Sequence, residues 1–290
     1  MNDLIVPIIT PFTQDNKIDK EKFYKHADFL IKNGVDYLLL CGSTGLGPSL
    51  RKDERIEILE TISYMKDKLI LQVGSLDMNE SLELATIAKK SGIKYIASLP
   101  PYYYPRLLEE WYVKYFKEIS KIYPTLVYNF PLTTNYDIRP ELVRKINKEG
   151  GNIVGIKDTT TDLDHILNFK WEFGKDFKVY CGPDVLMLPS IKMGIDGVIS
   201  GSGNYVPKLI KRLLDYPNEK VALDIQKLVT ELVLTSRKYG QWSVNYSLVK
   251  LINGYDVGFP RPPIFPLDQE QEIELSEVTK HVFSKFGKEV

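Results

Sequence analysis

A lysine interrupts a segment that otherwise has the composition of a buried β-strand. In NIVGIKDTT, residues 152–160, Lys157 follows three β-branched residues, and a short apolar run of this kind is typical of a parallel strand covered on both faces. Because a buried ammonium group is costly, Lys157 must pair with a carboxylate, reach solvent, or lower its pKa and become a neutral amine. Asp158 is not a suitable partner, since adjacent strand residues point to opposite faces. Of these states, only the neutral amine is a nucleophile.

A tyrosine occupies the matching position in the preceding predicted strand. Tyr128 lies in TLVYNF, and Lys157 lies late in the next apolar run. Neighbouring parallel strands are about 4.8 Å apart, so inward-facing side chains at these two positions can meet. A phenol beside an amine in a dry interior would give the nucleophile an acid–base partner. Core packing is the alternative interpretation of Tyr128.

Small residues follow the second predicted strand. In CGSTGLGPS, residues 41–49, Gly42 and Gly45 would let the backbone N–H groups of Ser43 and Thr44 converge on a small anion such as a carboxylate. The segment matches neither the GxxxxGK[ST] phosphate loop nor the GxGxxG dinucleotide turn. Carboxylate binding is therefore the predicted role, and a tight turn without a ligand is the alternative.

A regular alternation of strands and helices would position these residues. Amphipathic stretches, such as the stripe formed by Phe23, Ala27 and Leu30, separate eight short apolar runs. Eight βαβ units favour a closed (β/α)₈ or TIM barrel of the α/β class, which carries its functional residues at the carboxyl ends of the strands. A doubly wound open sheet is the alternative. The runs are LIVPIIT from Leu4, YLLLCG from Tyr37, LILQVG from Leu69, YIASLP from Tyr95, TLVYNF from Thr125, NIVGIKD from Asn152, FKVYCG from Phe177 and DGVISG from Asp196.

The chain after the eighth run is expected to be helical. We assign residues 1–215 to the barrel and residues 216–290 to a C-terminal helical extension that packs on it, so that the two form a single structural unit. The segment 253–268 contains four prolines and two glycines and must interrupt the helices.

Two arginines are placed where they could meet a substrate at the barrel mouth. Arg106 ends the aromatic segment PPYYYPR after the fourth run, and Arg237 lies in LTSRKYG, near the end of a helix that could fold back over the mouth. A guanidinium donates two parallel hydrogen bonds and suits a phosphate group. We therefore predict that both bind phosphate, with solvated surface arginines as the alternative.

The composition excludes several classes of partner. Lysine plus arginine and aspartate plus glutamate both number 38, so no global charge attracts nucleic acid or an anionic membrane. Cys41 and Cys181 lie outside any CxxC pattern, and the N-terminus lacks a signal peptide or membrane span, which predicts a cytoplasmic protein. The three histidines are scattered through predicted helices, so no metal centre or other cofactor is predicted, although carboxylates alone could hold Mg²⁺.

Six motifs occur in the order expected around the rim of such a barrel. They are PIITPF in the first strand, GSTG after the second, PPYYYP after the fourth, VYNFP in the fifth, GIKDT in the sixth and GVISG in the eighth. Together they resemble the class I pyruvate-dependent aldolases, the relatives of N-acetylneuraminate lyase and dihydrodipicolinate synthase, over nearly the whole chain. GSTGLGPSL, PYYYPR and GYDVGFPRPPIFPLD are most similar to the archaeal 2-keto-3-deoxygluconate aldolases.

The resemblance implies roles for particular residues. Lys157 would form a Schiff base with the keto carbon of pyruvate or of the keto acid being cleaved, and Tyr128 would shuttle protons. Ser43 and Thr44 would hold the pyruvate carboxylate, and Thr44 would also take part in catalysis. Tyr103 would pass into the active site of a neighbouring subunit in a homotetramer. The other predicted substrate-binding residues are Pro7, Arg106, Phe130, Thr159, Gly182, Ile199 and Arg237.

The chain departs from the dihydrodipicolinate branch of the resemblance at two places. No arginine follows the YN-P motif until Arg139, and Leu46 replaces the usual glutamate after GSTG. Both changes favour a polyhydroxylated aldehyde, which hydroxyls such as those of Thr133 and Thr134 would hold. Phe130 stands where the archaeal aldolases have tyrosine, which removes one hydroxyl contact.

The predicted function is reversible cleavage of 2-keto-3-deoxygluconate, and of its 6-phosphate, to pyruvate and a hydroxylated aldehyde, either glyceraldehyde or its phosphate. Two alternatives stay open. One is another lyase or synthase of the same fold, such as dihydrodipicolinate synthase or N-acetylneuraminate lyase. The other is a non-catalytic sensor that binds a keto acid.

Overall fold

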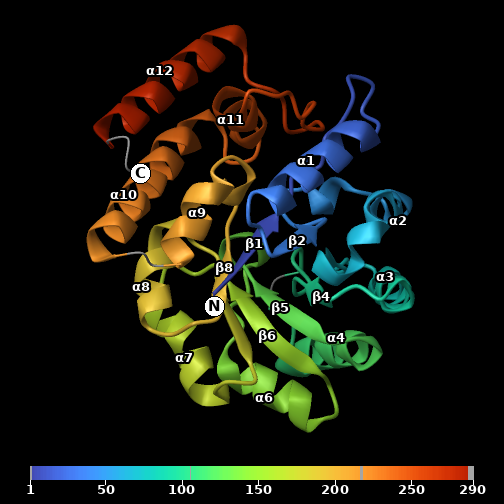
Figure 1. The fold of residues 1–290 in the computed structure, drawn as a ribbon. Coiled ribbons are helices and arrows are strands. Elements are labelled where there is room, and N and C mark those ends of the chain that lie inside the picture. The colour runs from blue at the N-terminus through green and yellow to red at the C-terminus, as the bar shows by residue number, and fades with distance from the viewer. Residues whose placement is uncertain (1, 105, 216–217, 287–290) are drawn as a thin grey trace.

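Eight parallel strands close into a barrel at the centre of the molecule (Figure 1). The computed structural model describes residues 2–104, 106–215 and 218–286. Each strand pairs with the next along the chain and β8 pairs with β1, so the predicted (β/α)₈ barrel is confirmed and the open sheet is wrong. The strands are β1 (Asp3–Pro7), β2 (Tyr37–Leu40), β3 (Leu69–Gln72), β4 (Tyr95–Ser98), β5 (Thr125–Asn129), β6 (Ile153–Asp158), β7 (Lys178–Cys181) and β8 (Gly197–Ile199).

Helices between the strands cover the outside of the barrel. Local signals set their ends, since the Asp19 and Asp162 carboxylates cap the first turns of α1 and α7, and Gly92, with a φ of 65°, ends α3. These helices are α1 (Lys20–Lys32), α2 (Lys52–Thr61), α3 (Met78–Ser91), α4 (Glu109–Ile122), α5 (Pro131–Thr134), α6 (Pro140–Lys148), α7 (Leu163–Phe173), α8 (Met187–Lys192) and α9 (Pro207–Leu214). Short 3₁₀ turns are η1 (Gly47–Ser49), η2 (Ser63–Lys68), η3 (Asp184–Leu186) and η4 (Ser202–Asn204).

Two apolar clusters hold the barrel together. Because successive strand residues point to opposite faces, Leu4 and Val6 join the large cluster beneath the helices, whereas Ile5 points into the barrel. Near the amino ends of the strands, the Tyr180 hydroxyl donates to Asp3 Oδ2 over 3.0 Å. The interior cluster consists of Ile5, Leu39, Ile70, Ala97, Leu126, Tyr180 and Ile199.

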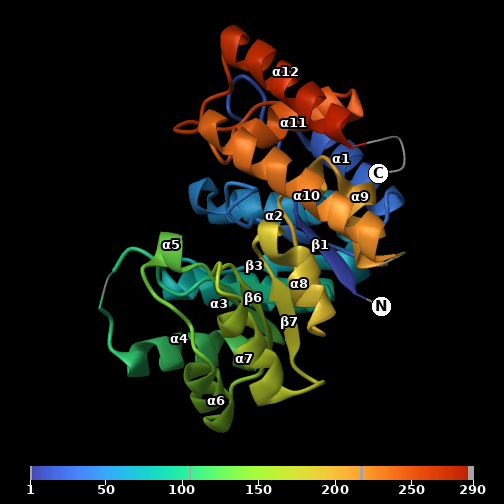
Figure 2. The ribbon, with the colours of Figure 1, turned by 90° about the vertical axis from the view of Figure 1, so that its left-hand side faces the viewer.

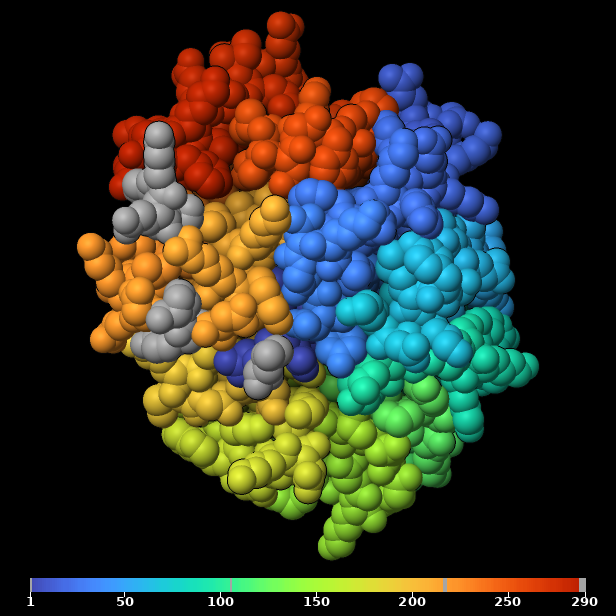
Figure 3. All heavy atoms as spheres, viewed as in Figure 1, coloured from blue at the N-terminus to red at the C-terminus, as the bar shows by residue number. Residues whose placement is uncertain are grey.

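Helices of the C-terminal region stack on one side of the barrel (Figure 2). They are α10 (Glu219–Ser236), α11 (Val244–Asn253) and α12 (Gln269–Lys285), with the 3₁₀ turn η5 (Arg237–Tyr239) after α10. The predicted interruption at 253–268 is confirmed, because α11 ends at Asn253 and α12 begins at Gln269. α10 contacts α8, α9 and η3, and Figure 3 shows the orange and red C-terminal helices against the blue N-terminal segment.

The predicted division of the chain after residue 215 stays a prediction. It falls beside residues 216 and 217, which lie outside the described residues. Within the described residues, no helix combines the length and apolar character needed to cross a membrane.

Candidate active site

A pocket of about 640 Å³ opens at the carboxyl ends of the strands, with the end of α10 and the start of α11 forming part of its wall. This is the end of the barrel at which the fold carries its functional residues. Nine of the residues predicted from the sequence line it, namely Pro7, Thr44, Tyr128, Phe130, Lys157, Thr159, Gly182, Ile199 and Arg237.

Lys157 and Tyr128 meet inside this pocket. They are register partners on β6 and β5, and the Lys157 Nζ donates to the Tyr128 hydroxyl over 2.8 Å. Both are buried, with Lys157 5% exposed. No carboxylate of the described residues lies within ion-pair distance of Nζ, so the phenol is its close polar partner. The arrangement predicted from strand order is confirmed.

The Tyr128 ring belongs to a small apolar cluster at the pocket. The Phe130 ring is nearly parallel to it, with centroids 6.1 Å apart, and Trp242 from the C-terminal region packs against the cluster of Leu99, Tyr128 and Phe130. The Ser43 hydroxyl lies 3.3 Å from the Tyr128 hydroxyl. The proton on the phenol can therefore pass between an amine and a hydroxyl without a large movement of the ring.

The loop after β2 is shaped for a small anion. Within the described residues, the backbone N–H groups of Ser43 and Thr44 have no hydrogen-bond acceptor. Gly45 packs tightly beneath them, since a Cβ there would lie 2.6 Å from Ile8 O, and the Thr10 hydroxyl donates to Gly45 O over 2.7 Å. The loop can therefore offer free donors at the wall of the pocket.

Polar atoms on the other wall lack partners. The buried hydroxyl oxygens of Thr159 and Thr160 and the Oδ1 of Asp184 make no hydrogen bond with the described residues. Burial raises the pKa of Asp184, which hydrogen bonds from Ser200 and Ser202 lower only in part. Since buried polar groups are normally paired, these three atoms are suited to bind the hydroxyl groups of a ligand.

Sequence reasoning missed several residues of this wall. Asp184 directly follows the seventh apolar run in CGPD, and an acidic residue just beyond a barrel strand was a usable signal. Gln241, Trp242 and Asn245 gave no such signal, because they come from the C-terminal region and reach the pocket only through the way that region folds.

Two predicted hydroxyl ligands are wrong. The Thr133 and Thr134 hydroxyls both donate to Phe130 O, over 3.1 and 3.0 Å, and neither residue lines the pocket. They follow a proline at the start of the short helix α5, where a threonine hydroxyl readily bonds to a carbonyl of the preceding turn. Thr159 and Thr160 line the pocket, where Thr133 and Thr134 were expected.

The predicted rim residues lie in different environments. Arg237 lines the mouth, as expected for a helix that folds back over it. Tyr103 is 72% exposed and stacks edge-on against Tyr104, and Arg106 is exposed, so both lie outside the pocket lining. Arg139 is 3.8 Å from Asp137 in a different hollow.

Comparison with known proteins agrees with this geometry. The dihydrodipicolinate synthetase family model matches residues 1–282. The chain is 42% identical to the 2-dehydro-3-deoxy-phosphogluconate/2-dehydro-3-deoxy-6-phosphogalactonate aldolase of Saccharolobus solfataricus, covering 98% of this chain and 97% of that protein. It is 35% identical to the 2-dehydro-3-deoxy-D-gluconate/2-dehydro-3-deoxy-phosphogluconate aldolase of Thermoproteus tenax, covering 94% and 89%.

A solved structure has the same fold throughout. The Sulfolobus sulfataricus 2-keto-3-deoxygluconate (KDG) aldolase complex with D-KDPG matches with a TM-score of 0.93 at 40% identity, covering 98% of this chain and 97% of that one. The family match, the relatives and this structure extend over nearly the whole chain. With its barrel and its lysine at the end of β6, the chain belongs to the dihydrodipicolinate synthetase family.

Proposed function

We propose that the protein is a class I aldolase that reversibly cleaves 2-keto-3-deoxygluconate, and its 6-phosphate, to pyruvate and glyceraldehyde or glyceraldehyde 3-phosphate. The observation that carries the proposal is a buried lysine amine, without a carboxylate partner among the described residues, 2.8 Å from a buried phenol. The names of the similar aldolases support the choice of substrate.

The reaction follows from this pair. The neutral Lys157 amine attacks the keto carbon, and the resulting carbinolamine loses water as Tyr128 gives a proton to the departing hydroxyl. The cationic imine then draws in electrons while the Tyr128 phenolate takes the C4 hydroxyl proton, so the C3–C4 bond breaks and the aldehyde leaves. Protonation of the enamine and hydrolysis of the imine release pyruvate and restore both side chains.

The walls of the pocket position the substrate. The free N–H groups of Ser43 and Thr44 bind the carboxylate at one side. Thr159, Thr160 and Asp184 line the other side, where each has a buried oxygen without a hydrogen-bond partner among the described residues, and they bind the hydroxyls. Phe130 offers an apolar surface in place of a hydroxyl contact.

Arg237 and Arg106 receive the phosphate of the longer substrate. Arg237 already lines the mouth, and Arg106 extends from the rim loop after β4. The test is kcat/KM for 2-keto-3-deoxygluconate and its 6-phosphate in Arg237→Ala and Arg106→Ala, with Arg139→Ala as the control outside the pocket. A loss confined to the phosphorylated substrate supports the assignment, whereas an equal loss for both substrates rejects it.

The working form is a homotetramer in which Tyr103 enters the site of a neighbouring subunit. Support comes from a group of exposed apolar side chains near the rim, which would be covered in an assembly. Sedimentation of a fully active monomer would contradict this proposal. The exposed residues are Tyr103, Tyr104, Leu108, Trp111 and Leu132.

We also propose a cytoplasmic location and a C-terminal region, residues 216–290, that acts with the barrel as one unit.

The decisive experiment is borohydride reduction in the presence of pyruvate, followed by peptide mass spectrometry. We expect modification at Lys157 alone, and no turnover in Lys157→Arg, because a guanidinium stays protonated and cannot form an imine. Lys148→Arg, at an exposed lysine, is the matched control. Modification at another lysine would overturn the mechanism. A trapped adduct without cleavage of any keto acid would favour the sensor, and preferred turnover of another acceptor would favour a different lyase or synthase.

A further inference from the structure

Directly behind the Lys157–Tyr128 pair lies a second pair of strand residues. Asn129 and Asp158 are the next residues on β5 and β6, are again register partners, and are completely buried. By strand alternation they face the surrounding helices instead of the pocket. Whatever fixes Asn129 and Asp158 therefore also fixes the strand ends that carry Tyr128 and Lys157.

The Asp158 carboxylate is bound from three directions. Its Oδ2 is 2.5 Å from His165 Nδ1 on α7. Its Oδ1 accepts from the Thr160 backbone N–H over 2.9 Å and from Asn129 Nδ2 over 3.4 Å. The carboxylate thus joins β5, β6, the loop that carries the pocket threonines, and the first turn of α7.

A second carboxylate faces the opposite edge of the same imidazole. Asp137 Oδ1 is 3.3 Å from His165 Nε2 and accepts from Asn129 Nδ2 over 2.9 Å. His165 therefore lies between two carboxylates, both of which also contact Asn129. Its Nε2 is buried and makes no hydrogen bond of good geometry with the described residues.

The surroundings of His165 are strongly acidic. Burial lowers its pKa, but the hydrogen bond to Asp158 and the charges of Asp158, Asp137 and Asp162 outweigh burial, so the net shift raises the pKa above its usual 6.5. Arg139 supplies a counter-charge, with its Nε 3.8 Å from Asp137 Oδ2. The charged and titratable groups around this hollow are Asp137, Arg139 and Glu141 before and on α6, and Asp162, Asp164 and Glu172 at and along α7.

We infer that His165, in its protonated form, is a positioning residue for the aldol reaction. The imidazolium can donate from both nitrogens, so it holds Asp158 and Asp137 together and keeps the ends of β5 and β6 in the register that brings Tyr128 to Lys157. When the imidazole is neutral, one of its nitrogens becomes an acceptor that faces a carboxylate, and the contact becomes repulsive. The inference rests on the proposed function of the Lys157–Tyr128 pair.

The sign of the pH effect follows. A group whose pKa is raised in the folded protein contributes below its usual pKa and loses its contribution as the pH rises through the folded value. Turnover should therefore fall on the alkaline side as His165 loses its proton. Removal of the Asp137 charge should move this fall to lower pH, because the remaining acidic groups hold the proton less tightly.

Two variants and one control test the inference. In His165→Gln we expect kcat to fall about tenfold, which is less than the ~10²-fold cost of moving a reacting group by 1 Å. We also expect the fall of kcat at alkaline pH to disappear. In Asp137→Asn, which retains the side-chain shape, we expect kcat to fall by less than in His165→Gln and the alkaline fall to begin at lower pH than in the parent protein. His281→Gln on α12, at an exposed histidine, should match the parent protein.

The outcomes separate this inference from the proposed function. If pyruvate traps Lys157 normally but the pH profiles of His165→Gln and Asp137→Asn match the parent protein, the positioning role is overturned and the aldolase stands. If the parent protein forms no adduct, both fall. If His165→Gln does not fold, the direction of the shift in Asp137→Asn decides, since a purely structural contact would not move the alkaline fall.

Discussion

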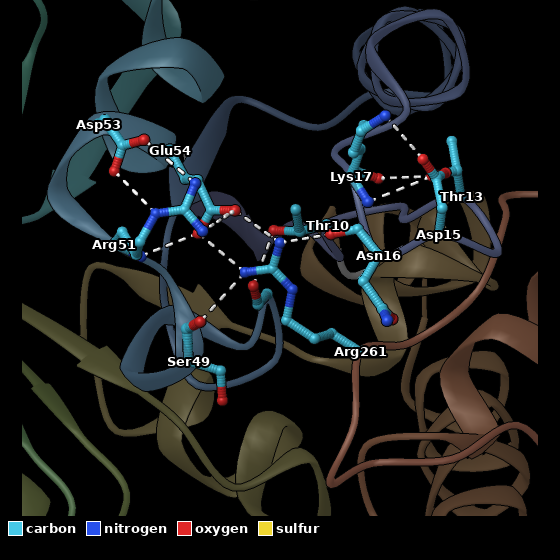
Figure 4. Close-up of polar contacts among 11 residues, drawn as sticks. Thr10, Thr13, Asp15, Asn16, Lys17, Ser49, Arg51, Asp53, Glu54 and Arg261 are labelled. Carbon is cyan, nitrogen blue, oxygen red and sulfur yellow. Dashed lines mark hydrogen bonds and ion pairs between the residues drawn. The ribbon is translucent and has the colours of Figure 1, made fainter.

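The two sides of the active site are braced by ion pairs of different chemistry. Behind β5 and β6, a histidine lies between two aspartates. Behind the loop after β2, which we propose binds the carboxylate, Arg261 from the segment between α11 and α12 reaches Glu54 near the start of α2, with its Nη1 2.8 Å from Glu54 Oε2 (Figure 4). The histidine can lose its positive charge as the pH rises, and the arginine cannot.

The arginine brace connects the C-terminal region to the loop after β2. Arg261 also donates to Asn16 O over 2.7 Å and to Ser49 O over 3.2 Å, and its guanidinium lies 4.2 Å from the Phe12 ring centroid. Ser49 ends η1, only a few residues after Ser43 and Thr44. A hollow of about 700 Å³ surrounds this brace, and the charged side chains drawn in Figure 4 pair with one another there. We therefore place no ligand in it.

The two ion pairs are expected to weaken at opposite ends of the pH range. The hydrogen bond from Arg261 is the largest cause that lowers the pKa of Glu54, so this brace weakens only in acid. The His165 brace weakens in base, because its folded pKa is raised. Both ion pairs are therefore expected to be at full strength only between these two limits.

The largest expected effect is on kcat, when the reacting group Tyr128 is changed instead of the histidine proposed to position it. Tyr128→Phe removes the proposed proton shuttle but keeps the ring in its apolar cluster with Phe130, so kcat should fall by about 10²- to 10⁴-fold while pyruvate trapping at Lys157 persists. Steady-state kinetics and borohydride trapping measure the two quantities. Near-normal kcat would show that Tyr128 only packs in the core, and that it does not differ from His165 in its role.

The next effect concerns stability on the arginine side. Arg261→Met removes one of the two arginines that contact Glu54, which is 4% exposed and keeps Arg51 Nη1 at 3.3 Å, so the loss should lie below the about 3 to 5 kcal/mol that breaking a buried pair completely costs. Urea unfolding measures the loss, and the double variant with Glu54→Gln should recover part of it. Arg139→Met removes an exposed contact of 3.8 Å and should change the free energy of unfolding by no more than about 0.5 kcal/mol. Equal losses for the two single variants would show that burial does not distinguish them.

The pH dependence of these losses should run in opposite directions. The stability difference between the parent protein and Arg261→Met should shrink as the pH falls through the folded pKa of Glu54, which lies below its usual 4.5. The difference between the parent protein and His165→Gln should shrink as the pH rises through the folded pKa of His165, above 6.5. Urea titrations across this range test both signs, and parallel trends would refute the comparison.

The smallest expected effect tests the corrected hydroxyl assignment. Thr133→Val removes an exposed hydroxyl whose partner among the described residues is Phe130 O, so kcat/KM should change by less than twofold, equivalent to under about 0.5 kcal/mol. Thr159→Val removes a hydroxyl that has no partner among the described residues, on a residue that lines the pocket, and should raise KM for the sugar acid more. A larger loss in Thr133→Val would restore the prediction made from the sequence.

The sequence by itself determined the barrel and the pair at its centre. Short β-branched runs between amphipathic stretches specify strands and helices locally, and consecutive parallel strands are usually neighbours. Tyr128 and Lys157, each late in adjacent runs, were therefore expected to come together, and they are register partners. The prolines and glycines of 253–268 likewise ended a helix without help from the rest of the fold.

Only the tertiary structure decided which other residues join that pair. Thr133 and Thr159 have the same hydroxyl and both follow a strand, but the Thr133 hydroxyl bonds to Phe130 O within a local turn, whereas the Thr159 hydroxyl has no partner among the described residues. Asp137 meets His165 because a loop and a helix from different βα units pack side by side. Trp242 reaches Tyr128 because the C-terminal region folds back over the mouth. These contacts depend on long-range packing, which cannot be predicted from the periodicity of a single segment.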